Sequence, residues 1–175
     1  MSSDGDTFDD ELIGRMHGFF SNEGALSVSK DFEYRPQQQE MAVAVAGALI
    51  QSNPLVVEAG TGVGKSLAYL APAVAFALQQ KRKAVISTHT INLQEQLIDK
   101  DLPLLAKLME VGFSAVLMKG RANYLCPTRL RRVMADSDDL FESADIDELD
   151  LIDEWAEQTT DGSLSDLDFE PSTHV

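Results

Sequence analysis

The stretch that decides the fold is Leu55-Val56-Val57-Glu58-Ala59-Gly60-Thr61-Gly62-Val63-Gly64-Lys65-Ser66. A short apolar run comes first, a glycine-rich turn follows, and Lys-Ser opens an amphipathic segment. This order predicts a β-strand, a loop that holds a phosphate chain, and an α-helix. Glycines allow positive φ angles and let several backbone N–H groups approach one phosphate. We therefore expect a nucleoside triphosphate site, with the backbone from Ala59 to Gly64 around the phosphates.

Two side chains at the end of this loop have expected roles. Lys65 is expected to reach the β- and γ-phosphates, and Ser66 to complete a Mg²⁺ shell together with phosphate oxygens and water. The strict form of the motif begins with glycine. This chain has Ala59 at that position, a small residue that the same turn accepts.

The composition predicts one cytoplasmic α/β domain. The chain has 175 residues with 44% apolar content, enough for one sizeable core. No apolar run approaches the ~20 residues of a membrane span, and the acidic N-terminus differs from a signal peptide. The single cysteine, Cys126, cannot form an internal disulfide, in keeping with a cytoplasmic location.

The negative charge of the chain is concentrated near its C-terminus. Residues 133–175 hold 15 Asp and Glu and no Lys or Arg, whereas residues 1–132 hold 14 acidic and 14 basic residues. Phosphates are contacted by local Lys and Arg clusters rather than by net charge. The total of −15 therefore does not exclude a core that binds DNA.

The polar residues before the glycine-rich loop are candidates for base recognition. Residues 1–33 are expected to be an acidic lead and a short helix that packs on the domain. A buried helix is expected from about residue 36 to 51, because Pro36 suits a first helical turn. Arg35 and the following glutamines begin this helix. A glutamine has a donor and an acceptor and can read the N6 and N7 edge of adenine, but polar residues at a helix start have the same pattern.

Further strand and helix patterns follow the loop. Strands are expected at 84–87 and 113–118, with helices at 66–80, 91–97 and 101–110, which predicts a parallel sheet with right-handed crossovers. Loops at the carboxyl ends of parallel strands lie on the ligand side. Thr88, His89 and Thr90 are therefore expected to lie near the glycine-rich loop and to hold a nucleic-acid phosphate. Thr90 is also a candidate N-cap.

The last third of the chain changes from basic to acidic. Residues 119–132 include Arg121 and three more arginines beside Tyr124; they either grip a single strand or cover one face of a helix. Residues 145–156 have apolar residues at helical spacing, which predicts an acidic amphipathic helix. Residues 159–175 have the composition of a weakly ordered tail. Asp147-Glu148-Leu149-Asp150 lies inside the acidic helix, so we reject it as a Mg²⁺-binding box.

These motifs together resemble the superfamily 2 iron–sulfur DNA helicases of the DinG/XPD type, and are most similar to the bacterial DinG and YoaA branch. The resemblance runs from about Phe20 to Leu130. Residues 34–38 look like the Q motif, residues 58–66 like motif I, and residues 87–90 with 93–97 like motif Ia. Residues 119–126 look like the segment that supplies the first cysteine ligand of a [4Fe–4S] cluster.

The resemblance implies a RecA-like P-loop NTPase fold, with residues 34–120 as an incomplete first motor domain. Residues 121–158 would begin the iron–sulfur insertion and residues 159–175 would be its acidic tail. The implied function is ATP hydrolysis with Mg²⁺, coupled to movement along single-stranded DNA and to duplex unwinding, in DNA repair. By resemblance Gln38 contacts adenine with Arg35 beside it in the nucleotide site, and Cys126 supplies the first ligand of the cluster.

Parts of that machinery are absent from the sequence. A cubane cluster needs four thiolates, and the Asp-Glu-Ala-His box does not occur. We therefore expect the N-terminal part of a longer helicase, which alone binds nucleotide weakly and hydrolyses almost none. Two alternatives stay open: a P-loop kinase or other small NTPase, and a nucleotide-binding module without catalysis.

Overall fold

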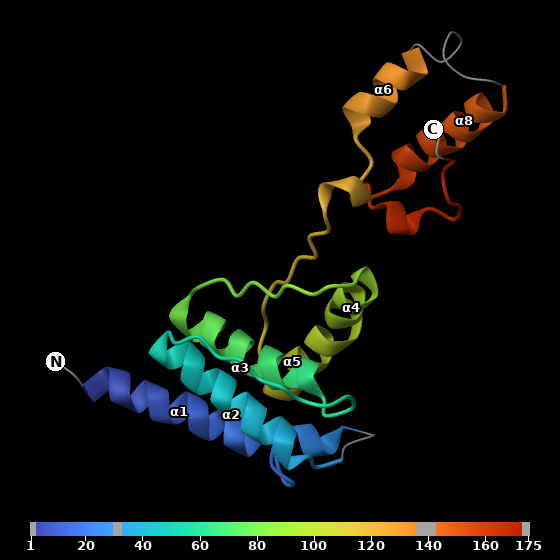
Figure 1. Cartoon of the computed structure of the whole chain (residues 1–175). Coiled ribbons are helices and arrows are strands. Elements are labelled where there is room, and N and C mark those ends of the chain that lie inside the picture. Colours follow the sequence, from blue (N-terminus) through green and yellow to red (C-terminus); the bar gives the residue numbers. More distant parts are fainter. Residues whose placement is uncertain (1–2, 30–32, 136–142, 173–175) are drawn as a thin grey trace. The chain divides into compact units, whose positions relative to one another are not determined.

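Helices make up nearly all of the regular structure in the described residues, which are 3–29, 33–135 and 143–172 of the computed structural model (Figure 1). The start of the predicted acidic lead, and residues 136–142 and 173–175, lie outside them. The chain divides into two units, Met1–Leu117 and Met118–Val175. Among the described residues, no helix is both long and apolar enough to cross a bilayer.

The helices of the first unit lie close to their predicted positions. α1 (Ser3–Phe19) is followed by the short 3-10 helix η1 (Ala25–Val28), and then by α2 (Pro36–Gln51) and α3 (Lys65–Gln80). α2 has the predicted bounds, since Pro36 fits its first turn and Ser52 ends it in the left-handed conformation, at φ 53°. α3 continues through Pro72, which is buried.

The predicted helices at 91–97 and 101–110 are joined by a wide turn. α4 (Ile91–Gln96) passes into a π-helical turn, η2 (Leu97–Asp101), and then into α5 (Leu102–Met109). Pro103 has no N–H to donate to the carbonyl four residues earlier, and its ring would clash with that carbonyl in a regular α-helix. The π turn lets the helical path continue despite this proline.

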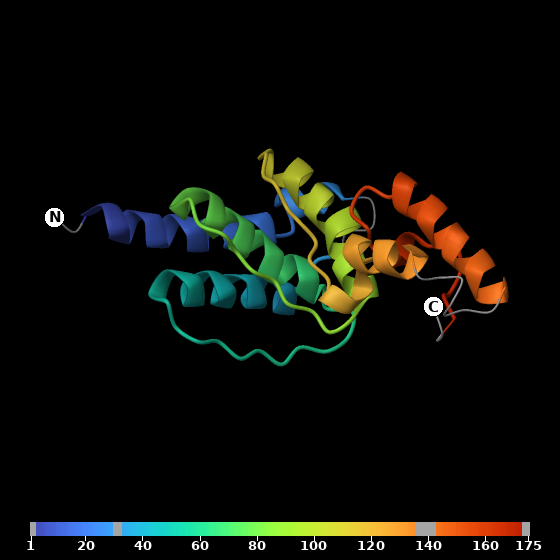
Figure 2. The ribbon, with the colours of Figure 1, turned by 90° about the horizontal axis from the view of Figure 1, so that it is seen from above.

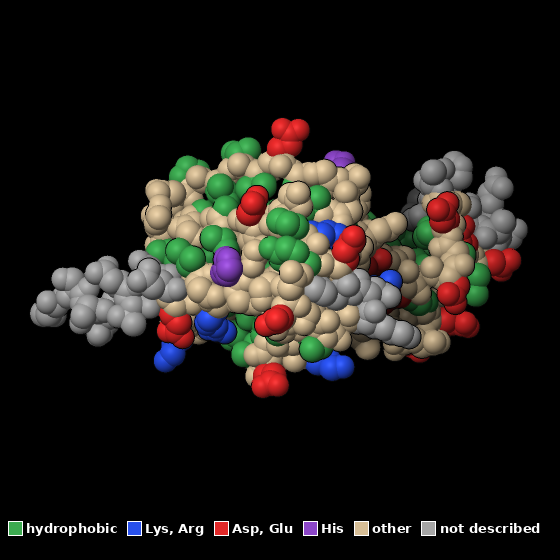
Figure 3. Space-filling model, turned by 90° about the horizontal axis from the view of Figure 1, so that it is seen from below, with side chains coloured by type: hydrophobic (Ala, Val, Ile, Leu, Met, Phe, Trp, Pro, Cys, Tyr) green, Lys and Arg blue, Asp and Glu red, His purple; other side chains and the backbone are tan. Residues whose placement is uncertain are grey.

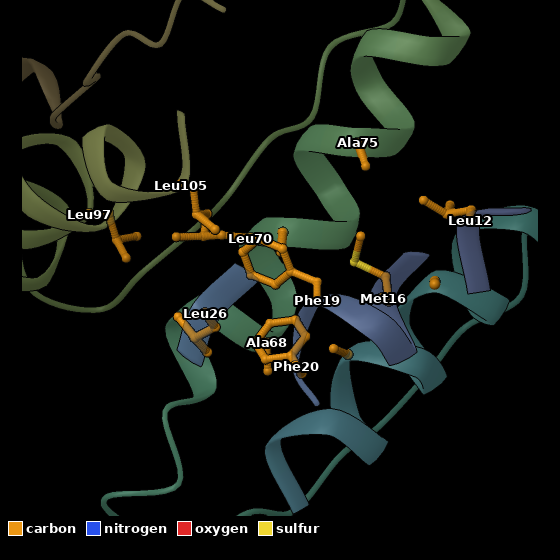
Figure 4. Close-up of a cluster of buried hydrophobic side chains, with 13 residues drawn as sticks. Leu12, Met16, Phe19, Phe20, Leu26, Ala68, Leu70, Ala75, Leu97 and Leu105 are labelled. Carbon is orange, nitrogen blue, oxygen red and sulfur yellow. The ribbon is translucent and has the colours of Figure 1, made fainter. Parts of the chain in front are cut away.

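One apolar core joins α1, α2 and α3. Leu12, Met16, Phe19 and Phe20 come from α1 or its end, and they pack with alanines of α2 and α3 (Figure 4). The rings of Phe19 and Phe20 meet edge to face, with centroids 5.1 Å apart. Leu97 and Leu105, from the π turn and α5, close the other side of the same cluster. α1 is therefore an integral part of the unit.

The predicted parallel sheet is not present in the described residues. Residues 53–60, 82–88 and 111–120 are extended, but the three predicted strands within them form no backbone hydrogen bonds with one another. Val56, Val85 and Val116 are 96%, 90% and 84% exposed. The predicted strands are not formed because a strand needs a neighbour for its N–H and C=O groups, which an apolar pattern alone does not supply. Figure 2 shows the segments after α2 and α3 running separately between helices.

The second unit is a small helical structure. It contains η3 (Arg121–Asn123), α6 (Pro127–Ala135), α8 (Ser143–Gln158) and η4 (Leu164–Asp166). Leu130 of α6 packs with Leu149 and Ile152 of α8, which confirms the predicted amphipathic acidic helix.

The segment predicted as a weakly ordered tail makes defined contacts in its described part, residues 159–172. Tyr124 and Ser163 form an isolated antiparallel bridge, and Leu125 N donates to Gly162 O at 2.8 Å. The buried Lys119 Nζ donates to the hydroxyls of Ser163 and Ser165 at 2.9 and 2.8 Å. The expectation was wrong for these residues because composition does not register partners 40 residues away.

Phe20→Ala should destabilise the first unit by about 3–5 kcal/mol, because Phe20 is 2% exposed and its removal leaves a cavity in the core. Urea unfolding followed by helical circular dichroism measures this change. Val28→Ala is the control, since Val28 is 77% exposed and should change stability by no more than about 0.5 kcal/mol. Equal effects of the two substitutions would contradict the assigned core.

Candidate functional site

The glycine-rich loop joins an extended segment to the start of α3. Gly62 and Gly64 have φ angles of 81° and 82°, and Gly64 is the N-cap of α3. L-residues adopt this conformation at a cost, which explains glycine at both positions. The first N–H groups of α3 have no partner within the helix and carry the positive end of its dipole. The loop therefore has the features of an anion-binding helix start.

Lys65 turns its ammonium group back across the loop. Its Nζ donates to the carbonyl oxygens of Ala59 at 3.0 Å and Gly60 at 2.7 Å. The positive charge therefore lies against the carbonyl oxygens at the start of the loop. Thr61, Gly62 and Val63 form the turn between these carbonyls and the helix.

Gln38 reaches the loop from α2. Its side chain is 6% exposed, and Nε2 donates to Gly64 O at 2.9 Å. A Cβ atom at Gly64 would lie 2.2 Å from this nitrogen, so the contact also requires glycine. The structure thus places the candidate adenine reader at the end of the glycine-rich loop, with its amide already bound to the backbone.

A hollow of about 360 Å³ lies beside the loop. Its walls come from the first turns of α2 and from the loop itself; they include Gln37, Glu40, Met41, Glu58, Gly60 and Val63. Of these wall residues, Gln37 belongs to the glutamine run considered for base recognition, and Glu40 had no predicted role. The glutamine run did not show which of its residues line the hollow, because side chains at adjacent helix positions point in different directions.

Ser66 is half-buried in the first turn of α3, and Tyr69 lies three residues further along the same helix. Burial raises the pKa of Tyr69, and its interaction with the Ser66 side chain opposes this shift. Burial also raises the pKa of Asp101, whose carboxylate accepts from Gln96 Nε2 at 3.3 Å. The i, i+3 spacing of Ser66 and Tyr69 was the available signal.

The candidate DNA contacts at 88–90 form the start of α4. Thr90 Oγ1 accepts from Leu93 N at 3.3 Å, which confirms that Thr90 is an N-cap. Thr88 Oγ1 donates to Thr90 O at 3.2 Å, and the side chain of His89 is exposed. These bonds give the segment a defined conformation at its exposed surface.

The candidate residues Arg35 and Arg121 are both accessible. Arg35 pairs with Glu33, with Nη2 2.9 Å from Oε2, and its side chain is 39% exposed. Arg121 begins η3 and is exposed, as are Arg129, Arg131 and Arg132 of α6. In the same unit the acidic residues of α8 and the following segment reach the surface (Figure 3). Basic and acidic side chains of this unit therefore lie on separate helices.

Cys126 is exposed and directly precedes α6. Interaction with the backbone N–H of Arg129 lowers the pKa of the Cys126 thiol, and the Arg129 and Arg121 charges act in the same direction. The chain has one cysteine, and the described residues contain no group of three or more His, Cys, Asp and Glu side chains suited to a metal. These residues do not fit a [4Fe–4S] cluster held by four thiolates.

Comparison with known proteins identifies relatives among helicases. Residues 35–174 match the DEAD/DEAH box helicase family. ATP-dependent DNA helicase YoaA of Escherichia coli (strain K12) is 42% identical over 147 residues, which cover 83% of this chain and 22% of that protein. ATP-dependent helicase DinG of Mycobacterium tuberculosis (strain ATCC 25618 / H37Rv) is 41% identical over 149 residues, covering 76% and 22%. This chain therefore spans about a fifth of the length of these curated relatives.

Gly64→Ala should destabilise the chain more than Gly62→Ala does. Both substitutions force alanine to a φ near 80°, at a cost of roughly 1–2 kcal/mol. Only Gly64→Ala also displaces Gln38, because nothing lies within 4 Å of a Cβ at Gly62. Urea unfolding of both variants measures the difference. Equal losses would show that Gln38 does not contact the loop.

Alkylation of Cys126 by iodoacetamide should have a pH midpoint below that of a cysteine in an unstructured peptide. The lowered pKa increases the thiolate fraction at any pH below the ordinary value. Arg129→Gln should move the midpoint upward, because it removes one of the charges that stabilise the thiolate. A midpoint equal to that of the peptide would contradict the described environment.

Proposed function

This chain belongs to the DEAD/DEAH box helicase family, and we propose that it is the ATP-binding N-terminal part of an ATP-dependent DNA helicase. The family implies a P-loop NTPase fold and use of ATP with Mg²⁺. The proposal for this chain is carried by one observation: an extended segment, two glycines at positive φ and Lys65 together surround the start of α3.

Each residue of the loop has a proposed part in binding the phosphates. The free N–H groups at the start of α3 bind phosphate oxygens, which the helix dipole favours. The Lys65 ammonium leaves its carbonyl partners and binds the β- and γ-phosphates, because a full negative charge attracts it more strongly than a carbonyl oxygen does. Ser66 would contribute its hydroxyl to Mg²⁺, while phosphate oxygens and water would supply the other ligands.

The base is proposed to lie against the first turn of α2. Gln38 offers a side-chain oxygen in addition to the nitrogen that bonds Gly64, and an amide has the donor and acceptor that the adenine edge requires. Arg35, one turn before it, is half-exposed and is proposed to face the nucleotide. The hollow of about 360 Å³ beside the loop lies between these elements.

Two groups of residues are proposed, each by itself, to contact single-stranded DNA: Thr88, His89 and Thr90 in the first unit, and Arg121 in the second. The first three residues lie at the N-terminal end of α4, where hydroxyls and free N–H groups suit a phosphate. Arg121 is exposed and positively charged. Movement along the strand would require coupling of these contacts to the nucleotide state, and we propose that coupling for the longer protein only.

Cys126 is proposed as one cluster ligand of the longer protein and not as a metal site of this chain. One thiolate in 175 residues cannot hold a four-thiolate cluster. We derive no step of the reaction through such a group.

A second candidate is a nucleotide-binding module that does not hydrolyse ATP. It is favoured for this chain alone because the sequence has no Asp-Glu-Ala-His box and the described residues offer no carboxylate cluster for Mg²⁺. Hydrolysis in helicases needs such acidic residues and arginines from a second motor domain. Binding and hydrolysis are therefore tested separately.

Lys65→Ala should weaken ATP binding by this chain at least tenfold, measured by competition with a fluorescent ATP analogue. In the full-length helicase it should abolish DNA-stimulated ATPase activity and leave binding of single-stranded DNA largely intact. The matched control is Lys107→Ala on the exposed face of α5, which should change neither property. Undiminished turnover in Lys65→Ala would refute the assignment of the loop.

A further inference from the structure

Gln39 is a buried polar residue that the proposed ATP site does not use. Its side chain is 8% exposed, and both ends of its amide are bonded. Nε2 donates to the backbone oxygen of His17 at 2.6 Å, and Oε1 accepts from the hydroxyl of Tyr34 at 2.9 Å. A buried amide with both ends satisfied fixes the position of its own backbone.

The His17 carbonyl belongs to the last turn of α1. Carbonyls in this turn have no partner within the helix, and the N–H of Ser21, which would be its helical donor, bonds Gly18 O instead. Gln39 therefore caps the C-terminal end of α1 from a neighbouring helix. The α1 residues Leu12 and Met16 are fully buried in the common core, so this end of α1 is firmly placed.

The residue next to Gln39 makes the contact with the glycine-rich loop. Gln38 and Gln39 both lie in the first turn of α2, and their backbone N–H groups share one acceptor, Arg35 O, at 3.0 and 3.3 Å. From this turn Gln39 reaches α1 and Gln38 reaches Gly64. Two adjacent side chains thus connect α1 to the loop through a single helical turn.

We propose that Gln39 is a positioning residue for the nucleotide base. It anchors the first turn of α2 to α1 and to Tyr34, and so holds Gln38 at the glycine-rich loop. The proposal rests on the proposed ATP site and extends it. No described hydrogen bond joins α1 directly to the glycine-rich loop, but through Gln39 and Gln38 α1 influences which base is bound. Gln39 acts through Gln38 and does not touch the nucleotide.

The test compares Gln39→Met with wild type and with Tyr34→Phe. Methionine has a similar length but neither donates to His17 O nor accepts strongly from Tyr34. Tyr34→Phe removes only one of the two bonds and keeps the fold. Gln51→Met is the matched control, because Gln51 is an exposed glutamine at the other end of α2 that bonds only Asn53 in the described structure.

Affinity for ATP and for GTP is measured on the 175-residue chain by competition with a fluorescent ATP analogue. Gln39→Met should weaken ATP binding three- to tenfold and GTP binding less than twofold, since the phosphate contacts stay in place. Tyr34→Phe should shift the ATP-to-GTP ratio in the same direction by a smaller factor, and Gln51→Met should not shift it. A lower melting temperature with an unchanged ratio would show a purely structural role and overturn the proposal.

A second measurement needs no nucleotide. The side-chain amide signals of Gln38 in the nuclear magnetic resonance spectrum should move towards those of a free glutamine in Gln39→Met and stay in place in Gln51→Met. Unmoved signals in Gln39→Met would overturn the positioning role. A wild-type chain that binds neither ATP nor GTP would instead contradict the proposed ATP site, so the two failures are distinguishable.

Discussion

The close contact between α2 and α3 is the constraint on which the rest of the first unit depends. Both helices present alanines to the shared core: Ala42 and Ala46 in α2, and Ala68, Ala71 and Ala75 in α3. Small side chains at helical spacing let two helices lie near each other. The glycine-rich loop starts from an extended segment beside these helices and ends at the first residue of α3. Its shape is therefore set by how the helices pack, and the large side chains of α1 complete that packing.

Local signals predicted the helices and the loop well. Pro36 marks the start of α2, Thr90 caps α4, and the glycines of the loop fall where positive φ angles occur. Each of these signals acts within a few residues. The predicted sheet is not present in the described residues, and the apolar run at 55–58 carries no information about which strand would lie beside it.

The sequence pattern also could not predict the hydrogen-bond partners of the site residues. Lys65 and Ser66 were identified from spacing alone, whereas the bond from Gln38 to Gly64 joins residues 26 positions apart. The contacts of Lys119 with Ser163 and Ser165 span more than 40 positions and give order to a segment whose composition predicts little. Long-range hydrogen bonds between polar residues leave no periodic trace in a sequence.

The π turn at 97–101 makes the number of residues between α4 and α5 decide which side chains of α5 face the core. Leu105 lies eight positions after Leu97, and in an uninterrupted α-helix their side chains would point about 80° apart. Both are buried in the same core, at 5% and 0% exposure, because the wide turn holds additional residues. The turn is equivalent to a one-residue insertion in a regular helix. The loss of one residue inside the turn would restore a regular helix and keep the later residues of α5 on the core side, whereas the loss of one residue from the α-helical parts would rotate them by about 100°.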